Sequence, residues 1–119
     1  MHTEHSPLSL LLDLIRAWVY LSSGMGLNVE WDSEKAEQNE RKHGVSFEEA
    51  LTVLSDPLAA ELPDPDHSER EVRMLLMGRA ATGRYLIVSL TERGDAVRLI
   101  SARLMTSRER RSYEQSLGL

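Results

Sequence analysis

Three apolar segments, over about residues 71–78, 84–91 and 96–103, constrain the fold of this chain more than any other feature. Each has the length and composition of a β-strand, and only the short glycine-containing connections AATG and ERGD separate them. Connections this short join neighbouring strands as hairpins, because a crossover to a parallel strand needs a dozen or more residues. The second half of the chain therefore predicts a three-stranded antiparallel meander.

The region before the meander predicts a strand and two helices that meet at a glycine corner. The strand is expected over 27–31, and the first helix should begin after the N-cap residue Asp32 and end at Gly44. In the corner KHGVSFEEA, the pattern S-x-x-E predicts a capping box that opens a second helix over about 47–54. The Asp-Pro pair that follows should end this helix.

The remaining elements complete an α+β domain over residues 27–119. A short edge strand over 58–62 and a polar loop over 63–69 precede the meander, and a T-x-x-E capping box at Thr106 opens a closing helix. The expected order is β-α-α-β-β-β-β-α. In this fold, two N-terminal helices pack on a twisted antiparallel β-sheet and a C-terminal helix follows it.

The most apolar stretch, residues 7–21, predicts an extra amphipathic helix within an N-terminal extension, residues 1–26. It is shorter than the roughly 20 apolar residues that span a bilayer. It also contains Asp13 and Arg16, whose spacing of three allows an ion pair on one helical face. A second interpretation is that the protein begins at Met25, at the start of the compact domain.

The net charge of −5 conceals an uneven distribution of charge along the chain. Residues 30–69 hold 12 acidic and 3 basic side chains, whereas residues 70–111 hold 10 arginines and 4 acidic side chains. Guanidinium groups suit phosphate, because their planar fork donates two parallel hydrogen bonds to phosphoryl oxygens. The arginine-rich half therefore predicts a polyanion site, with RNA as the leading ligand. The alternative is that the two blocks neutralise each other across the fold.

Metal and thiol chemistry have little support in this sequence. The chain has no cysteine, which excludes disulfides and thiolate metal sites. The loop DPDHSE, residues 64–69, contains carboxylates and an imidazole that could ligate a divalent cation. No second group of ligands accompanies it, so a polar loop is the favoured interpretation, and neither a metal nor a cofactor is expected.

Four blocks that occur in order carry a family resemblance: VEWDSEKAEQNERKHGVSFEEA, PDPDHSEREVR, MGRAATGRYLIVSLTERGDAVRLISAR and SRERRSYE. Together, over about residues 28–115, they resemble the BrnT toxins, small ribonucleases of bacterial type II toxin–antitoxin modules with a RelE-like fold. The resemblance implies a cytoplasmic, metal-independent endoribonuclease that acts on RNA and is neutralised by a BrnA-like ribbon-helix-helix antitoxin. Operator DNA would be reached only through the antitoxin, and no membrane partner is expected.

RNA cleavage without a metal needs a base, an acid, and cations that stabilise the phosphorane-like transition state. RelE-like toxins supply these from basic and aromatic side chains on the sheet and the terminal helix. The resemblance therefore implies five catalytic residues: Lys42, His43, Arg79, Glu92 and Arg103. It implies RNA binding by five more: Arg84, Arg98, Arg108, Arg111 and Tyr113.

Several of these residues have a plainer interpretation as structural groups. His43 could be a buried histidine at a helix end, and Arg103 could pair with a nearby glutamate rather than clamp a phosphate. Packing is the favoured role of Tyr113. Arg108 is the more diagnostic, because a cation in the first turn of a helix opposes the helix dipole unless an anion binds beside it. The alternative function is a non-catalytic binding subunit whose arginines form structural ion pairs.

Overall fold

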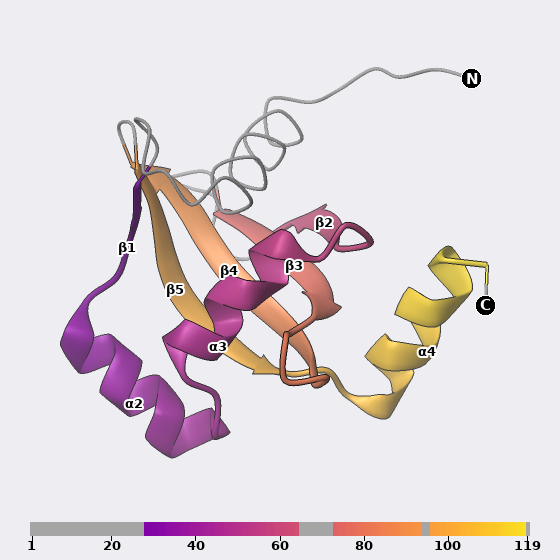
Figure 1. The fold of residues 1–119 in the computed structure, drawn as a ribbon, viewed down its shortest axis with the longest axis horizontal. Coiled ribbons are helices and arrows are strands. Elements are labelled where there is room, and N and C mark those ends of the chain that lie inside the picture. Colours follow the sequence, from indigo (N-terminus) through magenta and orange to yellow (C-terminus); the bar gives the residue numbers. More distant parts are fainter. Residues whose placement is uncertain (1–27, 65–72, 94–95, 119) are drawn as a thin grey trace.

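The computed structural model describes residues 28–64, 73–93 and 96–118 (Figure 1). Its elements are β1 Asn28–Glu30, α2 Ser33–His43, α3 Phe47–Leu51, the 3-10 helix η1 Thr52–Ser55, β2 Ala60–Pro63, β3 Arg73–Arg79, β4 Tyr85–Arg93, β5 Ala96–Leu104 and α4 Ser107–Ser116. The predicted order of strands and helices is confirmed, and the fold is α+β. The predicted helix over 7–21 and the candidate metal ligands Asp66, His67 and Glu69 lie outside the described residues.

The five strands form one sheet in the order β1-β5-β4-β3-β2. Strands β2 to β5 pair with their sequence neighbours in antiparallel fashion, as the short connections predict. β1 instead pairs with β5 in parallel, so the prediction of a purely antiparallel sheet is wrong at this edge. The turns that join the hairpins are visible in the local sequence. The direction of β1 instead depends on pairing with β5, almost 70 residues away, and no turn sequence connects these two strands.

Side chains of β3 and β4 alternate between two hydrophobic layers, one on each face of the sheet. The larger layer lies under α3 and η1, and it includes Phe47, Leu54, Leu76, Leu86, Val88, Leu90, Val97 and Leu99. The smaller layer lies under α4, and it includes Met77, Ile87 and Tyr113 with the partly buried Leu117. Within the described parts of the chain, no helix is long and apolar enough to span a membrane.

Local capping groups set the boundaries of the two N-terminal helices. The side chain of Asp32 accepts hydrogen bonds from the backbone N–H groups of Lys35 and Glu34, which lower the pKa of its carboxyl group. Gly44 ends α2 in the left-handed conformation with φ of 70°. The Ser46 side chain accepts a bond from a backbone N–H in the first turn of α3. The predicted second helix is present as α3 continued by η1.

Asn39 joins α2 to the part of the β5 edge that no strand of the described residues covers. β1 pairs with β5 only as far as Arg98. Beyond that point, the Asn39 Oδ1 atom accepts the Ala102 N–H at 3.1 Å, and its Nδ2 atom donates to the Ala102 carbonyl at 2.8 Å. Nδ2 also donates to the Val45 carbonyl at 2.9 Å. One buried amide therefore satisfies three backbone groups and fixes the end of α2 beside β5.

We expect Asn39→Ala to lower the free energy of unfolding by about 2 to 4 kcal/mol, because it leaves buried backbone groups without partners. Urea denaturation at neutral pH measures the loss. Gln38→Ala, an exposed neighbour on the same helix, is the matched control and should change stability by less than about 0.5 kcal/mol. Equal stabilities of the two variants would contradict this account of the β5 edge.

Candidate functional site

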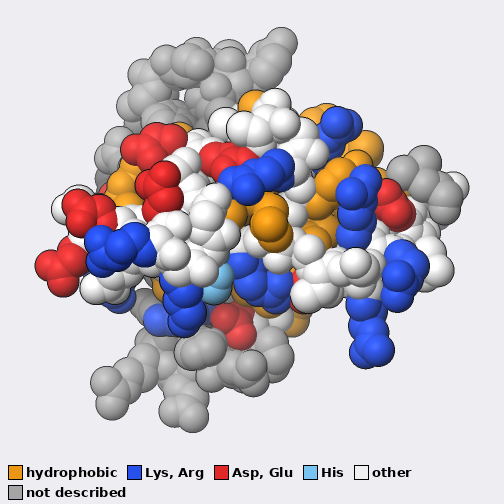
Figure 2. Space-filling model, turned by 90° about the horizontal axis from the view of Figure 1, so that it is seen from below, with side chains coloured by type: hydrophobic (Ala, Val, Ile, Leu, Met, Phe, Trp, Pro, Cys, Tyr) orange, Lys and Arg blue, Asp and Glu red, His pale blue; other side chains and the backbone are white. Residues whose placement is uncertain are grey.

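Four segments distant in sequence meet at one end of the molecule: the end of α2, the turn between β3 and β4, the end of β5 and the start of α4 (Figure 1). We call this the basic end. It holds six of the predicted site residues: Lys42, His43, Arg79, Arg84, Arg103 and Arg108. Figure 2 views the molecule from this end and shows Lys and Arg side chains spread across it, while most visible acidic side chains lie on the α2 side.

The structure does not bring all of the predicted residues to the basic end. Glu92 lies on β4 seven residues from Tyr85, which corresponds to about 23 Å along an extended strand. Arg98 lies near the start of β5, where its guanidinium group approaches the Glu30 carboxylate of β1 at 3.5 Å. Glu92 was predicted from the short motif TER. This motif carries no information about which end of β4 lies near the other predicted site residues.

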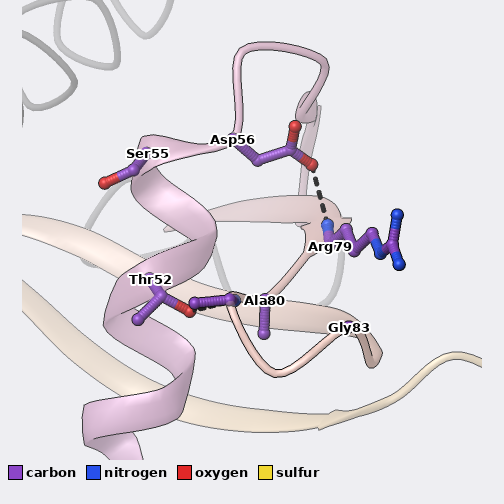
Figure 3. Close-up of a pocket in the computed structure, with 7 residues that line it drawn as sticks. Thr52, Ser55, Asp56, Arg79, Ala80 and Gly83 are labelled. Carbon is purple, nitrogen blue, oxygen red and sulfur yellow. Dashed lines mark hydrogen bonds between the residues drawn. The ribbon is translucent and has the colours of Figure 1, made fainter.

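Arg79 ends β3 beside a hollow of about 370 Å³, which is lined by Thr52, Ser55, Asp56, Arg79, Ala80, Ala81 and Gly83. The Arg79 N–H donates to Asp56 Oδ2, and the Ala81 N–H donates to Thr52 Oγ1, each at 2.8 Å (Figure 3). These bonds fix the backbone, while the exposed Arg79 side chain extends away from Asp56. Arg79 forms no ion pair with any described residue, so its guanidinium group is available to a ligand.

Gly78 permits the close contact between η1 and β3 that shapes this hollow. A Cβ atom at this position would lie 2.9 Å from both Asp56 Oδ2 and Val53 Cγ1. Val53 is fully buried and Asp56 is held by the Arg79 backbone, so neither atom can move away at low cost. The absence of a side chain at Gly78 therefore keeps the carboxylate in place beneath Arg79.

Tyr85 is the aromatic side chain that faces the arginines of the basic end. The guanidinium carbon of Arg110 lies 4.0 Å from the centre of its ring, and that of Arg79 lies 5.7 Å away. Tyr113 packs edge-on against the same ring at 6.1 Å. Sequence reasoning missed Tyr85, and it placed Arg110 in the arginine-rich half without giving it a role of its own. The hairpin register, which sets Tyr85 opposite Arg79, was the signal that could have found Tyr85.

Tyr113 is buried, with only 3% of its surface exposed. Its hydroxyl donates to the Leu58 carbonyl at 3.2 Å and reaches Asp56 Oδ2 at 3.4 Å. These contacts tie α4 to the segment between η1 and β2. The structure thus favours the packing role of Tyr113, because a buried ring offers no free face to an RNA base.

Arg103 forms a two-fold ion pair with Glu109 of α4. Its Nη1 and Nη2 atoms lie 2.8 and 2.9 Å from the two carboxylate oxygens. Glu109 also accepts the Thr106 N–H at 2.8 Å and completes the predicted capping box, which is confirmed. The Arg103 guanidinium group, assisted by the Thr106 N–H, lowers the pKa of Glu109 to about 2. This pair fixes α4 to the end of β5.

Arg84 is held in a similar way by Glu49 of α3. Its Nε atom donates to Glu49 Oε2 at 2.8 Å, and its Nη2 atom donates to the Gly44 carbonyl at 2.8 Å. The hydrogen bonds from Arg84 lower the pKa of Glu49. The proposed neutralisation between acidic and basic blocks therefore occurs at Arg84 and Arg98. Arg108 and Arg111 are exposed on α4 and form no ion pair within the described residues.

Lys42 and His43 lie in a second hollow, of about 260 Å³, at the open edge of β5. Its lining comprises Lys35, Gln38, Asn39, Lys42, His43, Ile100 and Ser101. His43 is half-buried, and its ring forms no hydrogen bond with any described residue. Arg103 lies two residues beyond Ser101 on the same strand, so both hollows belong to the basic end.

Comparison with known proteins assigns the chain to a family. Residues 31–109 match the family described as the ribonuclease toxin, BrnT, of type II toxin–antitoxin systems. The chain belongs to the BrnT family. Its structure is similar to the crystal structure of the Brucella abortus ribonuclease toxin BrnT, with a TM-score of 0.52 and 23% sequence identity over 68% of this chain and 99% of that one. That likeness establishes a shared BrnT fold. No curated protein matches the chain significantly.

The Arg103–Glu109 pair predicts a specific loss of stability in acid. Because folding lowers the pKa of Glu109 from 4.5 to about 2, its contribution is complete above pH 4.5 and is lost as the pH falls towards 2. We expect Glu109→Gln to cost about 1 kcal/mol or less at pH 7, as is usual for partly exposed pairs. The variant should also lose less stability than the wild type between pH 4.5 and pH 2. Urea titrations at several pH values test this, and parallel pH profiles would refute it.

Proposed function

We propose that this BrnT-family protein is a metal-independent endoribonuclease with a RelE-like arrangement of its site, acting on RNA in the cytoplasm. The observation that carries the proposal is Arg79. Its exposed guanidinium group has no carboxylate partner among the described residues, and it lies over Tyr85 beside an open hollow at the basic end. A cation without a partner beside an aromatic ring suits a nucleotide phosphate and its base.

The proposed reaction transfers the phosphate within the RNA chain. The 2′-oxygen attacks phosphorus while the bond to the 5′-oxygen breaks, giving a 2′,3′-cyclic phosphate and a 5′-hydroxyl end. Arg79 and Arg103 would stabilise the extra negative charge on the phosphoryl oxygens. His43 and Lys42 would transfer protons to and from the two ribose oxygens, since imidazole is the most frequent group in this role. The proposed reaction does not use Glu92, because it lies seven residues along β4 from Tyr85.

Arg103 can serve this reaction without leaving Glu109. The ion pair uses one N–H on each terminal nitrogen, and Nη1 also donates to the Leu104 carbonyl at 3.1 Å. The guanidinium group has five N–H donors, so two remain for a phosphate. Glu109 would then hold the arginine in a fixed orientation, which reduces the entropy lost when RNA binds.

We further propose that a BrnA-like ribbon-helix-helix antitoxin silences the enzyme by covering the basic end. Family membership supports an antitoxin partner, because the family consists of toxins of type II systems. An acidic surface on the partner would compete with RNA phosphates for Arg79, Arg108 and Arg111. Contact with operator DNA would then be made by the antitoxin alone.

A non-catalytic binding subunit is the second candidate function. It is favoured by the ion pairs of Arg84, Arg98 and Arg103, each of which is matched to a glutamate. Arginines committed to carboxylates in this way contribute to structure rather than to phosphate binding. The two functions differ in whether RNA is cut.

Incubation of the purified protein with total RNA in EDTA tests the nuclease directly. We expect products with 2′,3′-cyclic phosphate ends, and a loss of at least about 100-fold in rate for Arg79→Ala combined with Arg103→Ala. Arg41→Ala is the control, because Arg41 is exposed on α2 and pairs only weakly with Glu37 at 3.8 Å. Intact RNA with the wild type, or equal cleavage by all three proteins, would exclude the proposed chemistry.

Salt dependence separates phosphate binding from structural ion pairs. The affinity for a non-cleavable single-stranded oligonucleotide should fall with salt by a slope of about −0.7 for each phosphate contacted. Arg79→Ala with Arg108→Ala should reduce that slope by about 1.4, since two contacts are removed. Fluorescence anisotropy at four or more salt concentrations gives the slopes. A slope near zero in the wild type would favour the non-catalytic subunit.

A further inference from the structure

We propose that the hollow beside Tyr85 is a binding subsite for one nucleobase of the RNA, next to the phosphate held by Arg79. This inference rests on the proposed function and specifies how that site would recognise its substrate. The hollow has a volume of about 330 Å³ and is lined by Gly83, Arg84, Tyr85, Leu104, Met105 and Arg110. It is separate from the hollow that contains Asp56, although the two share Gly83.

The lining of this hollow matches the surface of a nucleobase. Leu104 leaves 44% of its surface exposed, and together with Met105 it supplies an apolar wall. Arg110 stacks on Tyr85, with its guanidinium carbon 4.0 Å from the ring centre, and this stack forms the flat part of the lining. A base has apolar faces and a polar edge, and it stacks on aromatic rings and guanidinium planes alike.

The flat groups of the hollow are already held in position. The rings of Tyr113 and Tyr85 pack in an edge-to-face arrangement, which restricts the orientation of Tyr85. Glu114 accepts a hydrogen bond from Arg110 Nε at 3.3 Å, although half of the Arg110 side chain remains exposed. Ordered groups lose little conformational entropy when a ligand binds, so this stack is preorganised. The Tyr85 hydroxyl has no hydrogen-bond partner among the described residues and remains available to the ligand.

The hollow lies next to Arg79, so a base bound in the hollow would be close to a phosphate bound by Arg79. Arg79 and Tyr85 are directly paired across strands β3 and β4, at the closed end of the hairpin. The guanidinium carbon of Arg79 also lies 5.7 Å from the Tyr85 ring centre. A nucleotide bound here can therefore place its phosphate at Arg79 and its base against Tyr85 and Arg110. This arrangement would determine which nucleotide flanks the cleaved bond.

Two oligonucleotides of identical charge test the subsite. The probes are a short single-stranded 2′-O-methyl RNA, which cannot be cleaved, and an abasic strand with the same number of phosphates. The wild type should bind the base-containing strand more tightly by about 5- to 150-fold, the value of stacking one base. Tyr85→Leu and Arg110→Gln should each reduce this preference several-fold, whereas Tyr85→Phe should retain most of it. Fluorescence anisotropy measures all the affinities.

The control for lost charge is Arg41→Gln, which removes an exposed arginine of α2 and should leave the preference for bases intact. Tyr85 also packs on Tyr113, so the thermal stability of Tyr85→Leu must be measured alongside. Arg110→Gln changes an exposed position on α4 and provides a second variant that leaves the buried layers untouched. No preference in the wild type, or an unchanged preference in both Tyr85→Leu and Arg110→Gln, overturns the subsite.

The two experiments distinguish a failure of the base subsite from a failure of the nuclease proposal. If RNA is cleaved in EDTA while the preference for bases is independent of Tyr85 and Arg110, the subsite alone is overturned. If the preference depends on these residues while RNA stays intact, the subsite is supported and the nuclease chemistry is overturned.

Discussion

The arrangement of the basic end depends on one amide at the open edge of the sheet. The described part of β1 pairs with β5 only as far as Arg98, and beyond that point Asn39 bonds to both backbone groups of Ala102. In doing so it holds the end of α2, with Lys42 and His43, beside the strand that carries Arg103. The same hydrogen bonds therefore satisfy the backbone of β5 and position the hollow that contains Lys42 and His43. Removing the Asn39 side chain is costly, because it would leave these buried backbone groups without partners.

The arginines of this acidic protein have two distinct uses. Arg84 and Arg103 are paired with Glu49 and Glu109, and these pairs link α3 to the start of β4 and α4 to the end of β5. Arg79 is held by its backbone, which leaves its guanidinium group uncommitted. Net charge therefore says little about this surface, because binding depends on which cations remain unpaired at one end of the fold.

Local signals in the sequence predicted most of the fold, and long-range geometry accounts for what they missed. Capping groups at Asp32 and Thr106 act within a few residues, and they set the starts of α2 and α4 as predicted. The short connections predicted the hairpins, but β4 extends to Arg93 and the edge strand over 58–62 is found at Ala60–Pro63. The parallel direction of β1 could not be derived in this way. For the site, the family resemblance identified residue types but not their placement. Glu92 lies at the far end of its strand from Tyr85. Tyr113 is buried, whereas Tyr85 is only half-buried.

The close contact at Gly78 limits how the cavity next to Arg79 could be redesigned. Even a methyl group there would collide with Val53 and Asp56, so the floor that Asp56 forms is packed directly against the hydrophobic interior. The rim is different, because Ser55 and Ala81 are exposed and substitution of their side chains leaves the interior unchanged. Substitutions at the rim can therefore change which ligand the cavity binds without lowering the stability of the fold. Substitutions at the floor would change the cavity and destabilise the protein at the same time.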